Sequence, residues 1–148
     1  MYYKKNLIVE TDWLENHIND PSLVVVDCDD VDIWSNREHI PSSIVIPQHH
    51  YIKNPKFTEN RSEFPLVPSC NDFSYLMDSM GINSDANVIA YDGSGSLYAA
   101  RFWWALNYFG HENVKVLNGG WSKWFAEARP SQKGEPHRNL GDIQRSKF

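Results

Sequence analysis

The amino-acid sequence predicts an α/β fold, with a mostly parallel sheet of about five strands and helices on both faces. Short apolar stretches rich in β-branched residues indicate buried strands, and the clearest runs from Leu23 to Val26. Between these stretches, apolar residues recur three and four positions apart, as in helices packed on a sheet. The chain has 148 residues, of which 41% are hydrophobic, and this suits one compact domain. Alternating strands and helices favour parallel strands with right-handed connections.

The first part of the chain supplies a helix and up to three strands. An apolar stretch at Leu7 to Glu10 precedes a helix for which Thr11 is a suitable N-cap. The stretch from Leu23 to Val26 is expected to be a strand covered on both faces, and it ends in polar residues. Ile44 to Ile46 is a short strand candidate, because a proline borders it on each side.

The second part alternates more regularly. Gln48 to Pro68 contains several prolines and little periodicity, which predicts a long surface loop. Ser69 to Met80 has helical spacing, with Ser69 or Asn71 able to cap it and Gly81 as its stop. The remaining expected strands and helices follow in alternation: Val88 to Tyr91, Leu97 to Phe109, Val114 to Leu117, and Trp121 to Ala126.

The end of the chain differs in composition from the rest. Residues 130–148 contain few large apolar side chains among prolines and charges, so we expect a linker or tail after a domain at residues 1–129. The net charge of -5 gives no reason to expect nucleic acid or an anionic membrane as a partner. No apolar run is long enough for a membrane span or a signal peptide, so the expected compartment is the cytoplasm.

Two cysteines, Cys28 and Cys70, are the only ones in the sequence, and they form no CxxC pair and no cluster with histidine. This pattern suggests neither a disulfide framework nor a zinc site. We therefore expect two reduced thiols, no metal and no cofactor.

The most informative segment joins a strand to a helix through Asp92, Gly93, Ser94, Gly95, Ser96 and Leu97. In an open parallel sheet, ligands bind beyond the carboxyl ends of the strands, where such loops meet helix N-termini. The two glycines permit backbone conformations in which successive N–H groups turn inward as an anion cradle. The simpler interpretation is that Ser94 and Ser96 only cap the helix. The segment matches neither the common phosphate loops nor a GxSxG elbow.

A wider comparison of motifs is more specific. The segment from Val88 to Trp124 contains Tyr-Asp after the strand, then Ala-Ala-Arg-Phe-Trp-Trp, Phe-Gly-His and Val-Leu-Asn-Gly-Gly-Trp. These motifs closely resemble the amino-terminal domain of tandem-domain sulfurtransferases of the rhodanese family. Upstream, a strand ending in Asp27 and the run His39-Ile40-Pro41-Ser42-Ser43 resemble further family motifs, although serines replace the usual glycine and alanine. The resemblance extends over roughly residues 7–129.

The resemblance implies a three-layer rhodanese-like fold and a thiosulfate or 3-mercaptopyruvate sulfurtransferase as the parent activity. In active domains, the residue directly after this strand is a cysteine that carries sulfur as a persulfide. Asp92 occupies that position here, and the resemblance implies a non-catalytic domain. A carboxylate among N–H donors at a helix N-terminus is stabilised by them and by the helix dipole, so we expect Asp92 to fill its own cradle. Asp27, Cys28 and Arg101 are candidates for the rim of the loop.

Three other interpretations remain open. Asp92 could form an acyl phosphate with help from Asp27, Asp29 and Asp30, although these acids make no recognised set. The chain could transfer sulfur weakly through Cys28 or Cys70. The loop could also bind an external anion for sensing.

The helix from Leu97 to Phe109 is apolar around most of its circumference, and such a helix needs cover on more than one side. Leu97, Ala100, Trp104 and Tyr108 form one apolar stripe along it. We therefore expect either a catalytic rhodanese domain, in the same or a separate chain, or self-association through this aromatic helix.

Overall fold

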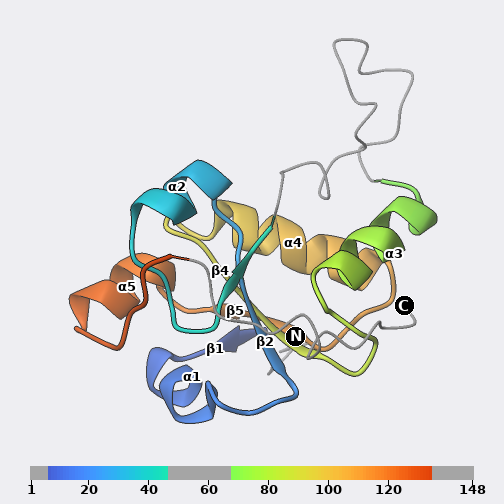
Figure 1. Ribbon diagram of the computed structural model, residues 1–148. Coiled ribbons are helices and arrows are strands. Elements are labelled where there is room, and N and C mark those ends of the chain that lie inside the picture. The colour runs from blue at the N-terminus through green and yellow to red at the C-terminus, as the bar shows by residue number, and fades with distance from the viewer. Residues whose placement is uncertain (1–6, 47–67, 135–148) are drawn as a thin grey trace.

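A five-stranded parallel sheet forms the centre of the protein in a computed structural model that describes residues 7–46 and 68–134 (Figure 1). The strand order is β1-β5-β4-β2-β3, and every pair of neighbours is parallel. The strands are β1 (Ile8–Val9), β2 (Leu23–Asp27), β3 (Ile44–Val45), β4 (Asn87–Tyr91) and β5 (Val114–Leu117). The prediction of an α/β fold with about five mostly parallel strands is therefore confirmed.

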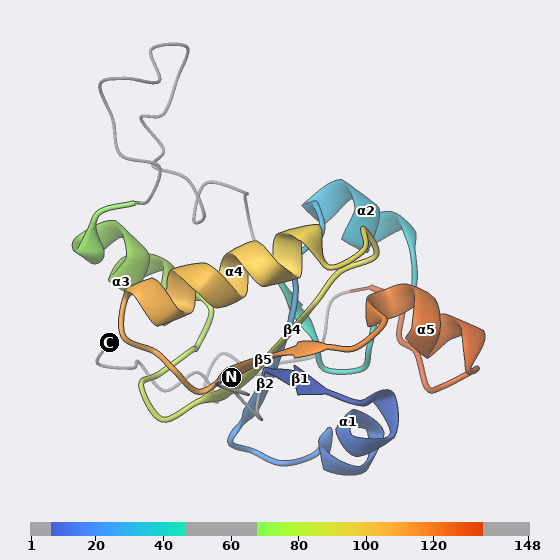
Figure 2. The same ribbon diagram turned by 180° about the vertical axis from the view of Figure 1, so that it is seen from behind.

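Helices cover both faces of this sheet. They are α1 (Thr11–His17), α2 (Val31–Asn36), α3 (Cys70–Ser79), α4 (Leu97–Tyr108) and α5 (Gly120–Ala126). Figures 1 and 2 show α3 and α4 on one face and α1 and α5 on the other. The layers follow from the strand sequences, because alternate side chains of a strand point to opposite faces.

Two hydrophobic cores lie on either side of the sheet. The core beneath α3 and α4 is built on Val24 and Val26 of β2 and includes Phe102 of α4. The core beneath α1 and α5 contains the intervening Val25, together with Trp124 of α5. A strand whose two faces are both buried needs a continuous apolar run, which explains the sequence of β2.

The carboxyl ends of β2 and β4 meet at one edge of the sheet. The pairing register places Asp27 opposite Tyr91, and the Cys28 N–H donates to the Tyr91 carbonyl at 2.8 Å. The loops after these two strands therefore leave the sheet side by side. This register brings the acidic residues after β2 to the segment that contains Asp92.

The element boundaries differ from the expected ones at informative places. Thr11 is not the N-cap of α1 but its first residue, because its side chain is buried and its hydroxyl donates to Glu127 at 2.6 Å. The short helix α2 has no counterpart in the sequence prediction, and the Asp30 carboxylate caps it by accepting from the Asp32 N–H. Ser69 does cap α3, as expected. The predicted loop at residues 48–68 falls outside the described residues except at its last position.

Residues 130–134, which the sequence assigns to a tail, lie against the body of the domain. The backbones of Gln132 and His39 exchange two hydrogen bonds of 2.8 Å in an isolated antiparallel bridge. The division into a domain at 1–129 and a linker at 130–148 stays a prediction. Within residues 7–46 and 68–134, no helix is long and apolar enough to cross a membrane.

Candidate functional site

Asp92 directly follows β4, and its side chain is enclosed by its own loop. Its Oδ1 accepts hydrogen bonds from the N–H groups of Ser94 and Ser96, at 2.9 and 2.8 Å. Its Oδ2 accepts from the N–H groups of Tyr98 and Ala99, both at 2.9 Å. The residue is 1% exposed, so these four donors replace water around the carboxylate. The loop is an anion cradle that holds the carboxylate of its own first residue.

The backbone conformation of the loop makes this convergence possible. Gly95 and Ser96 both have left-handed conformations, with φ of 72° and 69°, and the Ser96 N–H donates to Asp92. Ser96 precedes α4 without a side-chain cap, and the Ser94 hydroxyl donates to Asp29. Ser96 is the N-cap residue by position, but the side chain of neither serine caps the helix. The Asp92 carboxylate lies at the N-terminus of α4 instead, where the helix dipole also stabilises negative charge.

The end of β4 is also in close contact with the start of α5. The Trp121 N–H donates to the Asp92 carbonyl at 2.9 Å. A Cβ atom at Gly120 would lie 2.4 Å from that same carbonyl oxygen, so only glycine fits there. The Asn-Gly-Gly-Trp turn thus lets the start of α5 pack against the backbone of Asp92.

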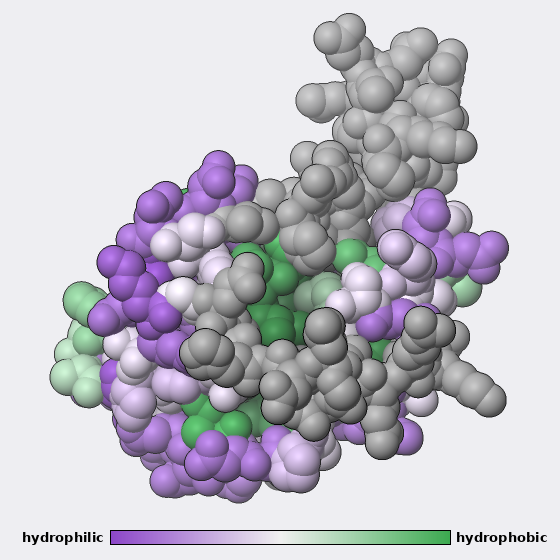
Figure 3. Space-filling model, viewed as in Figure 1, coloured by the Kyte–Doolittle hydropathy of each residue, from purple (hydrophilic) through white to green (hydrophobic). Residues whose placement is uncertain are grey.

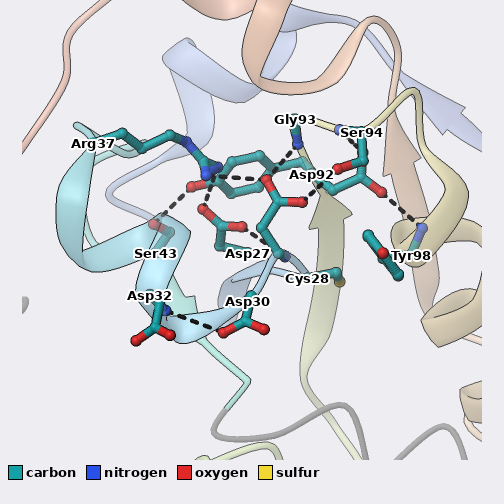
Figure 4. A network of polar contacts seen from close by, with 12 residues as sticks. Asp27, Cys28, Asp30, Asp32, Arg37, Ser43, Asp92, Gly93, Ser94 and Tyr98 are labelled. Atoms are coloured by element: carbon teal, nitrogen blue, oxygen red, sulfur yellow. Dashed lines mark hydrogen bonds and ion pairs between the residues drawn. The ribbon is translucent and has the colours of Figure 1, made fainter.

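A second buried carboxylate, from the segment after β2, supports the loop. Asp29 is 2% exposed, and its Oδ2 accepts from the Gly93 N–H at 2.7 Å. Its Oδ1 accepts from the Ser94 hydroxyl at 3.0 Å. Figure 4 shows the acidic segment after β2 facing the loop after β4. These contacts fix the position of the loop relative to the neighbouring strand.

Arg37 holds the two acidic side chains of the β2 end together. Its guanidinium contacts the Asp27 carboxylate at 2.7 Å (Figure 4). It also contacts the Asp29 carboxylate at 3.0 Å. The same group lies 5.2 Å from the centre of the Trp121 ring. A planar guanidinium suits this position because it can bond two carboxylates while stacking on an aromatic ring.

Burial controls the ionisation of the groups beneath the loop. It raises the pKa of Asp27 to about 6, and the Arg37 guanidinium opposes part of this shift. Burial also raises the pKa of the Cys28 thiol well above its usual value, and the charges of Asp27 and Asp92 raise it further. Cys28 is fully buried. The thiol of Cys28 therefore stays protonated, and a substrate cannot reach it.

The other residues predicted for the site lie in different surroundings. The Arg101 guanidinium stacks 4.5 Å from the centre of the Trp104 ring, and Leu97 at the start of α4 is 66% exposed. Cys70 is exposed at the start of α3. Phe73, one turn further along, stacks on Phe109 at the far end of α4 from Asp92. Among the described residues, no cluster of three or more His, Cys, Asp or Glu is arranged to hold a metal ion.

Sequence reasoning missed Arg37, which has no motif around it. The available signal was chemical: Asp27, Asp29 and Asp30 end a buried strand, and buried carboxylates require donors or a cation. Arg37 is the first basic residue after this acidic run.

We predict that Asp92→Asn will lower the free energy of unfolding by about 3 kcal/mol. An amide has only one acceptor oxygen, and its NH2 group would face two of the backbone N–H groups of the loop. Urea denaturation would measure this change. Asp85→Asn is the matched control, because Asp85 is exposed. Equal effects of the two substitutions would contradict the account of the cradle.

The raised pKa of Asp27 predicts a pH dependence of stability. Between about pH 4 and pH 6, the folded protein retains a proton that the unfolded chain has released, so stability falls as pH rises. The fall should amount to at most about 3 kcal/mol and should level off above this range. The difference in unfolding free energy between the natural chain and Asp27→Asn, measured against pH, isolates this effect. A difference that is constant from pH 4 to pH 7 would rule it out.

Comparison with protein families identifies the fold to which this site belongs. A model of the rhodanese-like domain matches residues 10–127. The chain is 31% identical over 129 residues to a protein of Thermus thermophilus named sulfur carrier protein TtuD. This alignment covers 87% of this chain and 43% of the relative. It is 30% identical over 135 residues to the putative thiosulfate sulfurtransferase SseA of Mycobacterium tuberculosis, covering 91% of this chain and 43% of that protein.

Solved structures agree with these relatives. The 3-mercaptopyruvate sulfurtransferase SseA of Escherichia coli superposes with a TM-score of 0.74 and 28% identity, over 88% of this chain and 53% of that one. A 3-mercaptopyruvate sulfurtransferase from Leishmania major has a TM-score of 0.75 at 20% identity, covers 99% of this chain and 40% of that one, and supports the fold alone. The chain spans less than half the length of the two curated relatives described above. It belongs to the family of rhodanese-like domains and is related to the thiosulfate and 3-mercaptopyruvate sulfurtransferases.

Proposed function

We propose that this domain is a non-catalytic part of a sulfurtransferase, with a structural or regulatory role. The observation that carries the proposal is the set of four N–H groups bound to the Asp92 carboxylate. In active domains of the family that the sequence resembles, a cysteine stands at this position. Here the cradle has kept its donors, and a fixed carboxylate takes up all four of them.

The chemistry of the two side chains explains why the exchange removes activity. Sulfur transfer needs a polarizable nucleophile that attacks the sulfane sulfur of a donor and later releases it to an acceptor. A carboxylate is a poor nucleophile toward sulfur and forms no stable persulfide equivalent. Both oxygens of Asp92 are also engaged by backbone donors and are shielded from solvent.

The thiols of this chain offer little support for a separate sulfurtransferase activity. Cys28 lies beneath the loop, but it is fully buried and its pKa is raised. Cys70 is exposed, but α3 begins at the end of α4 opposite the cradle. We therefore infer that neither thiol uses the N–H donors that the family employs for the persulfide.

The proposed partner is a catalytic rhodanese-like domain in the same or a separate chain. The outer face of α4 supports such a contact, because Leu97, Trp104 and Tyr108 are 66%, 40% and 58% exposed. Phe102 and Trp124 are fully buried inside the domain and are not available to a partner. Figure 3 shows another hydrophobic area at the left edge, over α5, where Phe125 is 62% exposed. Self-association through α4 is the alternative use of the same face.

The direct test is thiocyanate formation from thiosulfate and cyanide. We expect no turnover above background for the natural chain, and turnover at least about tenfold above that background for Asp92→Cys, whose thiolate would meet the donors of the cradle. Activity in the natural chain that disappears in Cys28→Ser or Cys70→Ser would contradict the proposal. Asp92→Ser is the control, since its hydroxyl is too weak a nucleophile to restore transfer.

A further inference from the structure

The last described segment, residues 130–134, forms a strap between α5 and the turn after α2. The Trp124 indole N–H donates to the Pro130 carbonyl at 2.7 Å, which fastens the beginning of the strap to α5. The backbone bridge between Gln132 and His39 fastens its middle to the turn after α2. Figure 1 shows this segment running from α5 toward that turn.

His39 holds the end of the strap from inside the domain. Its ring is fully buried and stacks on Trp34, with 4.5 Å between the ring centres. Its Nε2 lies 2.6 Å from the Gly134 carbonyl oxygen, so this nitrogen must carry the proton and donate. Its Nδ1 lies 3.0 Å from the Ser43 hydroxyl and 3.0 Å from the Ile40 carbonyl.

Ser43 continues the contact toward β4. Its hydroxyl lies 3.0 Å from the Tyr91 hydroxyl, which also accepts from the Ile40 N–H at 3.2 Å and hydrogen-bonds to Asp27. Ser43 and Tyr91 are fully buried. Burial raises the pKa of Tyr91 well above its usual value, so the hydroxyl keeps its proton. The family motif that this turn resembles has alanine where Ser43 stands, so the bridging hydroxyl is a departure of this chain.

We propose that Tyr91, Ser43 and His39 form a buried relay. It couples the position of the strap to the conformation of the Asp92 loop. Tyr91 directly precedes Asp92, and its hydroxyl bonds to the Ser43 hydroxyl and to the Ile40 N–H. Each of these three groups is buried and bonded to the next, so the loss of one contact weakens the arrangement of its neighbour.

The coupling acts in both directions, as any equilibrium coupling must. A partner that holds residues 130–134 in place stabilises the cradle, and an event that loosens the cradle releases the strap. The relay would thus connect the last described segment to the loop that contains Asp92. This inference stands on the contacts of the folded chain and does not require the proposed function.

Hydrogen exchange of single amides by NMR tests the relay. In Tyr91→Phe, we expect the Gln132 amide to exchange about tenfold faster relative to the Val88 amide, which reports on opening of the central sheet. Ser43→Ala should act in the same direction and is the milder variant if Tyr91→Phe does not fold. Phe73→Leu, in the opposite core, is the control and should accelerate both amides equally.

The reverse direction has its own readout. His39→Phe should accelerate exchange of the Ala99 amide, which donates to Asp92, several-fold relative to Val88. An unchanged ratio of Gln132 to Val88 exchange in Tyr91→Phe and Ser43→Ala would overturn the relay. The relay would also be overturned if His39→Phe accelerated exchange of the Gln132 amide but left exchange of the Ala99 amide unchanged. The strap and the loop would then open independently.

Discussion

The carboxylate of Asp92 faces inward because four backbone N–H groups of its own loop converge on it. These N–H groups belong to the loop and to the first turn of α4, where a helix leaves its N–H groups without partners of its own. The negative charge satisfies them and also interacts favourably with the dipole of α4. The loop is therefore closed around the side chain of its own first residue. The surrounding contacts keep that carboxylate in place.

Those contacts come from three directions. Asp29 holds the Gly93 N–H from the neighbouring strand, and Arg37 balances the charge of the acids beneath the loop. Gly120 allows the start of α5 to approach the Asp92 carbonyl. A parallel sheet makes this arrangement possible, because its strands all deliver their following loops to the same edge. This edge of the sheet is filled with hydrogen-bonded carboxylates.

The sequence predicted the fold and drew attention to Asp92, but it did not predict the contacts around that residue. The apolar run of β2 and the helical spacing of α3 and α4 are strong local signals, and the motif around Asp92 identified the loop. Arg37 and the strap residue Gln132 gave no local signal, because their roles depend on contacts with residues distant in the sequence. The stripe of Leu97, Trp104 and Tyr108 is the exposed side of α4, since Ala99, Phe102 and Leu106 fill the core instead. Periodicity finds an apolar stripe, but on a helix that is apolar almost all round it does not show which side faces the sheet.

The central claim is that the Asp92 side chain, rather than an external ligand, occupies the cradle. Calorimetric titration of thiosulfate into the natural chain and into Asp92→Gly tests it most directly, because glycine removes the carboxylate and leaves the N–H donors. The account predicts no binding heat with the natural chain and saturable binding with the variant. Saturable binding to the natural chain that is unchanged in Asp92→Gly would show that the anion site lies elsewhere and would contradict it.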